Sequence, residues 1–157
     1  MERERDPAVA FEEFVDLWQT LLAEGRRPGT TAVVEGERDR RSLRRMGWAG
    51  EIAVVHRGRT IAATAQSLVE GSRRVIVLTD WDVAGGTFAR RLREFLSAER
   101  VELDLEYRRR LAHLLRGELA HVEGLYGWAR RSAERYGVPF DRVVDGPDGP
   151  SAPPPTE

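Results

Sequence analysis

Three carboxylates follow apolar runs of the sequence at positions where a metal-dependent reaction would need them. Glu35 comes directly after the run 31–34, and Asp80 and Asp82 follow the run 75–78. If both runs are parallel strands of one sheet, their carboxyl ends share one edge, and the three side chains converge there. Converging carboxylates repel one another, and a divalent cation removes that repulsion. The pattern predicts a Mg²⁺ site, because Mg²⁺ binds one or two carboxylates together with water and phosphate oxygens.

The same residues indicate how such a site would act on a phosphodiester. Asp80 and Asp82 are predicted to hold the metal, and Glu35 to serve as general acid or base or as a further metal ligand. Gly85 and Gly86 follow in the next turn, where they let the backbone turn tightly and approach a phosphate at a helix start. An Asp-x-Asp pair alone is a weak signal, so the prediction rests on both acidic motifs following strand-like runs.

Three other residues lie near this edge in the predicted layout. Arg57 and Arg59 flank Gly58 after the second predicted strand, where either guanidinium can contact a substrate phosphate. Trp81 lies between the two aspartates and suits two interpretations. It either stacks on an unpaired base or packs in the core.

The elements that must position these residues alternate along the chain. Apolar spacing predicts an amphipathic helix over Ala8 to Ala23. Beyond it the patterns predict strands over 31–34, 52–55, 75–78 and 101–105, separated by helices over 37–46, 61–69 and 86–96. Strands that alternate with helices favour an α/β fold with a doubly wound, mainly parallel four-stranded sheet.

The domain organisation follows from the same patterns. We expect an N-terminal helix and linker over 1–30, a sheet domain over 31–105, a C-terminal helical extension over 106–140 and a disordered tail over 141–157. The extension has one apolar stripe from Tyr107 to Tyr136, but its three glycines weaken the case for a single continuous helix. The tail is rich in Asp, Gly and Pro and has too few apolar residues to order itself.

Composition restricts the classes of protein that fit. The chain has 157 residues, of which 41% are hydrophobic and 32% charged, as expected for one globular core. It has no cysteine, which excludes disulfides and thiolate chemistry. No apolar run approaches the ~20 residues of a membrane helix, and the start lacks a signal peptide, so a cytoplasmic protein without a membrane partner is expected. The net charge of -1 leaves nucleic-acid attraction to local patches.

The acidic motifs resemble those of a known family. The order Val33-Val34-Glu35-Gly36-x-x-Asp39, a Gly58-Arg59-Thr60 turn, and Val75-Ile-Val-Leu-Thr-Asp-x-Asp-x-x-Gly85 resemble the Toprim domain. That domain occurs in topoisomerases, bacterial-type primases, old-family nucleases, recombination-repair proteins and the nuclease that matures small ribosomal RNA. The likeness covers about residues 31–105. The Leu-Thr-Asp-x-Asp-x-x-Gly form of the second motif looks most like the ribosomal-RNA-maturing nuclease and the small stand-alone Toprim proteins found in archaea among others. The Tyr107-Arg-Arg-Arg-Leu stretch also looks like the stand-alone group.

The resemblance implies roles for the matching positions. Glu35 would be the metal-linked general acid or base, and Asp80 and Asp82 the pair that chelates Mg²⁺. Gly36 would keep the turn open, and Asp39 would either face the helix and support the site or bind the metal directly. A supporting role is expected for Gly85 as well. Gly86 and Thr87 follow Gly85 with no further Asp in the motif, which departs from a strict acidic triad and argues against a complete two-metal site.

Two nucleic-acid functions stay open at this level, beside a metal-binding globular protein whose helical extension only caps the sheet. The first is a Mg²⁺-dependent nuclease, or another phosphotransfer enzyme, acting on structured RNA or DNA. The second is a non-catalytic module that binds nucleic acid or a ribonucleoprotein partner on a Toprim scaffold. A complete topoisomerase or primase does not fit, because the residues outside 31–105 are too few for the additional domains of those enzymes.

Overall fold

Short β-branched and apolar segments build the centre of the fold. The computed structural model describes residues 5–55 and 59–145, and within them four strands form one sheet in the order β2-β1-β3-β4. The central strands are β1 (Thr30–Val34) and β3 (Arg74–Val77), and the edge strands are β2 (Glu51–Val54) and β4 (Glu102–Asp104). All three strand pairings are parallel, which confirms the predicted α/β class and four-stranded parallel sheet.

The two faces of the sheet carry separate apolar clusters. Successive side chains of a strand point to opposite faces, so neighbouring residues of β1 and β3 belong to different clusters. Ala32, Val34, Ile76 and Leu78 face one cluster, whereas Val33, Val75 and Val77 face the other. The central strands are therefore buried on both sides.

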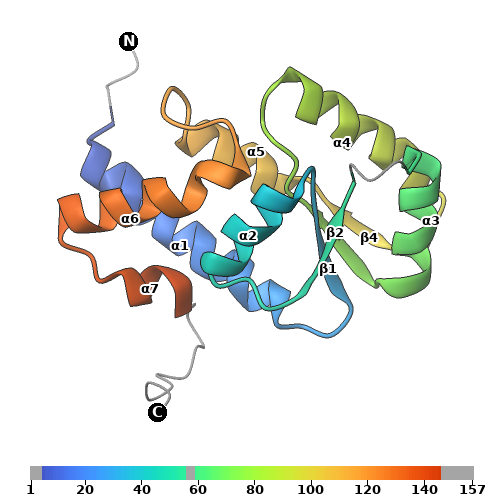
Figure 1. Cartoon of the computed structure of the whole chain (residues 1–157), viewed down its shortest axis with the longest axis horizontal. Coiled ribbons are helices and arrows are strands. Elements are labelled where there is room, and N and C mark those ends of the chain that lie inside the picture. Colours follow the sequence, from blue (N-terminus) through green and yellow to red (C-terminus); the bar gives the residue numbers. More distant parts are fainter. Residues whose placement is uncertain (1–4, 56–58, 146–157) are drawn as a thin grey trace.

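Helices cover both faces and give the molecule three layers (Figure 1). The second cluster lies under α3 (Ile61–Gly71) and α4 (Val83–Leu96). The first cluster is larger and collects helices from both ends of the chain. These helices are α1 (Pro7–Gly25), α2 (Glu37–Arg45), α5 (Glu106–Leu114), α6 (Leu125–Tyr136) and α7 (Phe140–Asp145).

The helix α1 is part of the core and not an appendage to it. Asp6 caps its amino end by accepting the amide of Ala8 at 3.0 Å, and Pro7 occupies a first-turn position that needs no amide donor. Phe14 and Trp18 are fully buried, and the indole of Trp18 donates to the carbonyl of Met46 at 2.8 Å. This contact joins the first helix to the end of α2.

The C-terminal part is more divided and extends further than its sequence pattern predicts. The chain leaves α5 after Leu114, turns through Gly117 at a φ of 82°, and passes a 3-10 turn, η1 (Val122–Gly124), before α6. Helix α7 also contradicts the expected start of the tail at Asp141. Val143 is fully buried and α7 packs on α1, which supplies the apolar contact that the tail composition does not reveal. Residues 146–157 lie outside the described residues.

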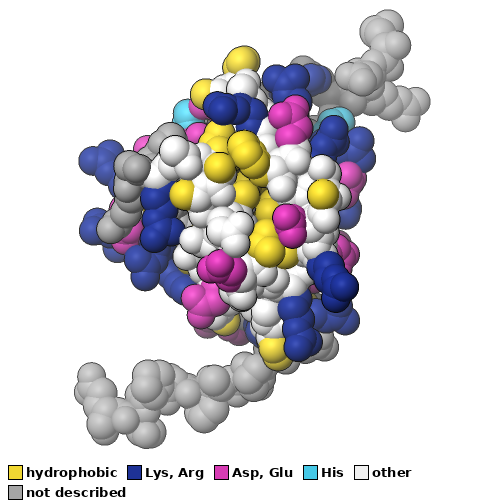
Figure 2. Space-filling model, turned by 90° about the vertical axis from the view of Figure 1, so that its right-hand side faces the viewer, with side chains coloured by type: hydrophobic (Ala, Val, Ile, Leu, Met, Phe, Trp, Pro, Cys, Tyr) yellow, Lys and Arg dark blue, Asp and Glu magenta, His cyan; other side chains and the backbone are white. Residues whose placement is uncertain are grey.

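The side of the molecule formed by α3 and α4 exposes some apolar side chains to solvent. Figure 2 shows apolar side chains gathered in the middle of this side of the molecule, between charged borders. Phe95 is 47% exposed on α4 and Val83 is 88% exposed at the start of that helix. No helix in the described residues is long and apolar enough to span a membrane.

Candidate metal centre

The two central strands deliver Glu35 and Asp80 to the same edge of the sheet. The chain continues from β1 outward to β2, and from β3 in the opposite direction to β4. Adjacent parallel strands whose connections diverge in this way leave a crevice at their carboxyl ends, which is the usual ligand site of such sheets. Glu35 directly follows β1, and Asp80 lies three residues after the end of β3.

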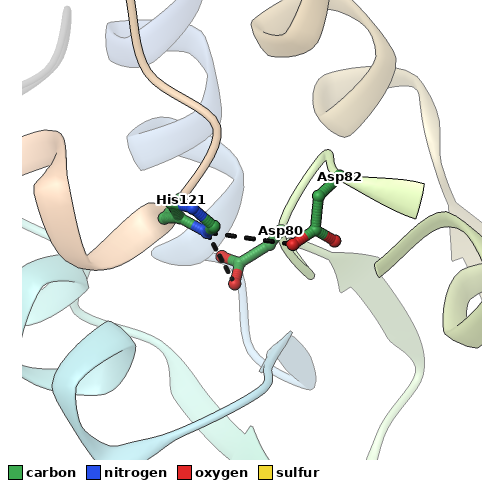
Figure 3. Close-up of side chains that lie close together, drawn as sticks. All are labelled: Asp80, Asp82 and His121. Carbon is green, nitrogen blue, oxygen red and sulfur yellow. Dashed lines mark ion pairs between the residues drawn. The ribbon is translucent and has the colours of Figure 1, made fainter. Parts of the chain in front are cut away.

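Asp80 and Asp82 meet an imidazole that arrives from the distant C-terminal part (Figure 3). His121 immediately precedes η1, and its Nδ1 lies 3.2 Å from Asp80 Oδ2 and 4.0 Å from Asp82 Oδ2. One ligand atom from each of the three residues lies within 4.8 Å of the others. The hydrogen bond with Asp80 raises the pKa of His121, and the charge of Asp82 acts in the same direction. This group can hold a metal ion.

Glu35 contacts the same group from the sheet side. Its Oε2 accepts the amide of Asp80 at 2.8 Å, and its carboxyl group also hydrogen-bonds to the side chain of Asp80. Burial raises the pKa of Glu35 to about 7, and the charges of Asp80 and Asp82 add to this effect. A carboxyl group with this pKa can both give up and take a proton near neutral pH.

Arg108 donates hydrogen bonds to the backbone of the turn between β3 and α4. Its Nε donates to the Thr79 carbonyl at 3.1 Å and its Nη2 donates to the Asp80 carbonyl at 2.7 Å. Burial lowers the pKa of this guanidinium, whereas the charges of Glu35, Asp82 and Asp80 raise it. Arg108 is therefore a fixed cation beside the acidic group, and it orients the backbone that carries Asp80.

Asp39 supports the centre without facing it. Its side chain is 6% exposed, with Oδ2 accepting the amide of Gly36 at 2.9 Å and Oδ1 accepting the amide of Glu123 at 3.0 Å. Both carboxylate oxygens are thus bound to backbone donors. Since Glu123 belongs to η1, Asp39 links the turn after Glu35 to the segment that carries His121.

Gly85 is required by the shape of the turn after Asp82. A Cβ atom at this position would lie 1.7 Å from the carbonyl oxygen of Asp80, far inside any permitted contact. The amide of Gly85 donates to Asp82 Oδ1 at 2.7 Å, which makes Asp82 the cap of α4. One aspartate therefore both starts the helix and faces the metal group.

Comparison with known proteins places the chain in a family. No family model matches it. A UPF0292 protein of Methanosarcina acetivorans is 32% identical over 128 residues, covering 77% of this chain and 83% of that protein. A UPF0292 protein of Archaeoglobus fulgidus is 40% identical over 115 residues, covering 72% of this chain and 89% of that protein. The chain belongs to the UPF0292 family.

A solved structure shares the fold of this UPF0292 chain. It is a protein from Aquifex aeolicus that aligns with a TM-score of 0.58, covering 71% of this chain and 94% of that one. The two sequences are 22% identical, so the likeness concerns the fold alone.

Not every predicted site residue of the UPF0292 chain lies in this centre. Glu35, Asp80 and Asp82 lie together, with Gly36, Asp39 and Gly85 around them. Arg59 is exposed and donates to Ser67 on α3 at 3.0 Å, while Arg57 lies outside the described residues.

Two residues of the centre carry no clear signal in the sequence. His121 lies within the apolar stripe of the C-terminal extension but belongs to no acidic or metal-ligand motif, so only the three-dimensional packing brings it to the aspartates. Arg108 is one of three consecutive arginines, and nothing in the pattern separates it from its exposed neighbours Arg109 and Arg110.

Proposed function

We propose that this UPF0292 protein is a Toprim-type, Mg²⁺-dependent enzyme that acts on nucleic-acid phosphodiesters, most concretely a nuclease for structured RNA or DNA. The observation that supports it best is the meeting of Glu35, Asp80, Asp82 and His121 at the crevice between β1 and β3. The resemblance of both acidic motifs to the Toprim domain supports the same proposal.

In this proposal Asp80, Asp82 and His121 hold the metal ion. Two carboxylates and one imidazole form a donor set for a divalent cation, and Arg108 alone cannot neutralise the three carboxylates of the centre. A bound Mg²⁺ would supply positive charge that offsets the charge developing on a phosphate oxygen.

Glu35 is the proposed proton carrier. It lies next to Asp80, and burial, as the largest cause, raises its pKa to about 7. A metal ion on Asp80 and Asp82 would offset the part of this rise that comes from their charges. A general acid or base with a pKa close to the working pH is the most effective, and such groups contribute about 10²–10⁴-fold to a rate.

A cleavage assay with labelled structured RNA, single-stranded DNA and duplex DNA tests this function. The expected result is cleavage that requires Mg²⁺ or Mn²⁺ and falls at least about 100-fold in Glu35→Gln. Glu99→Gln is the matched control, because it makes the same change on an exposed side chain beyond α4 and should leave the rate unchanged. A wild-type protein that cleaves none of the substrates with either metal would overturn the proposal.

A second candidate is a module that binds nucleic acid or a ribonucleoprotein partner without chemistry. It is supported by the backbone contacts that already engage both aspartates, since Asp80 accepts the amide of Val122 at 3.1 Å and Asp82 caps α4. Residues with such structural duties do not need a reaction to explain their presence. Nucleic acid that co-purifies with the protein and stays intact with Mg²⁺ and Mn²⁺ would favour this candidate.

A further inference from the structure

A hollow of about 740 Å³ lies beside the metal centre, which is the size of a typical ligand cleft. We name it the α5 groove because much of its wall comes from that helix and the segment after it. Two of its residues tie it to the centre, since His121 belongs to both and Trp81 separates Asp80 from Asp82. Its main side chains are Trp81, Arg109, His113, Arg116, Glu118 and His121.

The helix side of the groove is basic. Arg109 and His113 lie four residues apart on one face of α5, and Arg116 follows in the turn after the helix; all three are exposed and line the same hollow. Arg109 also pairs with Glu106 at 2.6 Å, whereas Arg116 has no ion-pair partner in the described part of the chain. The acidic wall residue Glu118 accepts a hydrogen bond from the indole N–H of Trp128, with 2.6 Å between Nε1 and Oε2. The net charge of the chain is -1, so this basic strip is a local feature.

Trp81 gives the groove an aromatic wall of fixed orientation. Its Nε1 donates to the carbonyl of Leu119 at 2.5 Å, and its amide donates to the carbonyl of Ala120 at 3.1 Å. The side chain is half-buried, so part of the ring is accessible in the groove. A fixed aromatic surface beside guanidinium groups suits an unpaired base that stacks while its phosphates contact arginine.

We infer that the α5 groove binds a single-stranded segment of RNA or DNA and leads it to the metal centre. This inference deepens the proposed function. Only its second part, that the strand is led to the metal centre, rests on that function. An acidic peptide would also be attracted to Arg109 and Arg116, but it offers no base for Trp81. The groove therefore fits a polynucleotide better than a polypeptide.

Binding in the presence of EDTA tests the groove apart from any cleavage. Fluorescence anisotropy is measured with labelled single strands of about 12 nucleotides, as RNA and as DNA, over a series of salt concentrations. The groove variant is Arg109→Gln with Arg116→Gln. The control is Arg73→Gln with Arg100→Gln, which removes the same charge from exposed positions at the opposite end of the sheet.

The groove variant is expected to bind at least about tenfold more weakly than the wild type. The slope of log affinity against log salt should also fall by about 1.4, because each lost phosphate contact to a single strand contributes about 0.7. The control should match the wild type. An abasic strand of equal length should bind more weakly than the normal strand, and equal binding of the two would overturn the role of Trp81.

The outcomes separate this inference from the proposed function. Equal affinity of groove variant and control, or tighter binding of a polyglutamate peptide than of either strand, would overturn the groove even where the enzyme cleaves nucleic acid. Groove-dependent binding without cleavage by the metal-loaded protein would support the groove and overturn the nuclease.

Discussion

Asp80 and Asp82 each use one carboxylate oxygen for the backbone and present the other to the candidate metal position. Asp80 Oδ1 accepts from Val122 and Asp82 Oδ1 from Gly85, while the Oδ2 atoms face His121. Asparagine keeps one carbonyl oxygen for the backbone contact and removes the charge. The substitution Asp→Asn therefore separates the two duties at both positions.

We expect the Asp80→Asn, Asp82→Asn double variant to bind Mg²⁺ and Mn²⁺ at least about tenfold more weakly than the wild type, since two charged ligands are lost. Asp39→Asn should change the affinity less, because both oxygens of Asp39 are bound to backbone amides. Isothermal titration calorimetry measures the three affinities. Undiminished binding in the double variant would refute this position for the metal.

His121 should influence which metal binds. Imidazole nitrogen is a better ligand for Mn²⁺ and later transition metals than for Mg²⁺. His121→Gln is thus expected to weaken Mn²⁺ binding more than Mg²⁺ binding in the same calorimetric titration. His113→Gln on the exposed face of α5 is the control. An unchanged Mn²⁺ affinity in His121→Gln would show that the imidazole is no ligand.

Gly85 sets the backbone course of the metal turn. Gly85→Ala is expected to destabilise the fold by at least about 2 kcal/mol, because its Cβ would collide with the Asp80 carbonyl and the turn would have to shift. Gly71→Ala, at the end of α3, is the matched control, since no atom lies within 4 Å of the added carbon. It should change stability by less than about 1 kcal/mol. Urea unfolding measures both, and equal effects would contradict the steric argument.

At the scale of elements, an ion-pair network ties the first helix to the sheet edge opposite the metal centre. Arg74 on β3 has an 18% exposed side chain that reaches Glu24 of α1 at 2.9 Å and Asp104 of β4 at 2.7 Å. Tyr107 of α5 adds a hydrogen bond to Glu24. Four elements thus meet around one guanidinium.

The environment of Tyr107 should make the fold sensitive to alkali. Burial raises the pKa of Tyr107, and the charge of Glu24 and its hydrogen bond add to the effect. An unfolded tyrosine ionises near pH 10, so the stabilisation is complete below that pH and is lost as the pH rises towards the higher pKa of the folded state. Melting temperatures from pH 8 to pH 11.5 should show this loss in the wild type and a smaller one in Tyr107→Phe.

Tyr136→Phe on α6 is the control for this pH effect and should keep the alkaline loss of the wild type. At neutral pH, Tyr107→Phe should cost about 1 kcal/mol through the hydrogen bond to Glu24. Identical pH curves for wild type and Tyr107→Phe would contradict the assignment.

The elements could be predicted well where local periodicity determines them. All four strands occur within about two residues of their expected bounds, because short apolar runs, and the alternation of apolar and acidic residues in the fourth, leave few other structures. The sequence predicts the start of α4 at Gly86, three residues late, because the glycines suggest a turn, whereas the cap by Asp82 starts the helix at Val83. The position of His121 could not be predicted, because it depends on how the segment after α5 folds back onto the sheet.

For the molecule as a whole, the first apolar cluster joins the two ends of the chain. Phe11 and Phe14 of α1 contact the ring of Trp128 in α6 at centroid distances of 5.7 and 4.8 Å. Helix α7 packs on α1 as well. The segment 31–105 therefore contains the sheet but only part of the core that stabilises it.

We expect a chain truncated after Leu105 to lose cooperative folding, because α1 loses α5, α6 and α7 and one face of the sheet becomes exposed. Thermal melting followed by circular dichroism should show no sharp transition, and Mn²⁺ should not restore one without His121. A chain ending at Asp145 is the control and should melt like the full chain, since the residues it lacks are rich in Pro and Gly. A cooperative transition in the shorter chain would contradict this expectation.

The pairing of α1 with α6 also affects the nascent chain on the ribosome. Phe11 is synthesised 117 residues before its contact Trp128, an interval of about 6–23 s at ~5–20 residues per second. Throughout that time α6 and α7 cannot yet cover the apolar side of α1. The newly made helix thus exposes Phe11 and Phe14 during synthesis, and such transiently exposed apolar surface is prone to aggregation until the last helices emerge and cover it.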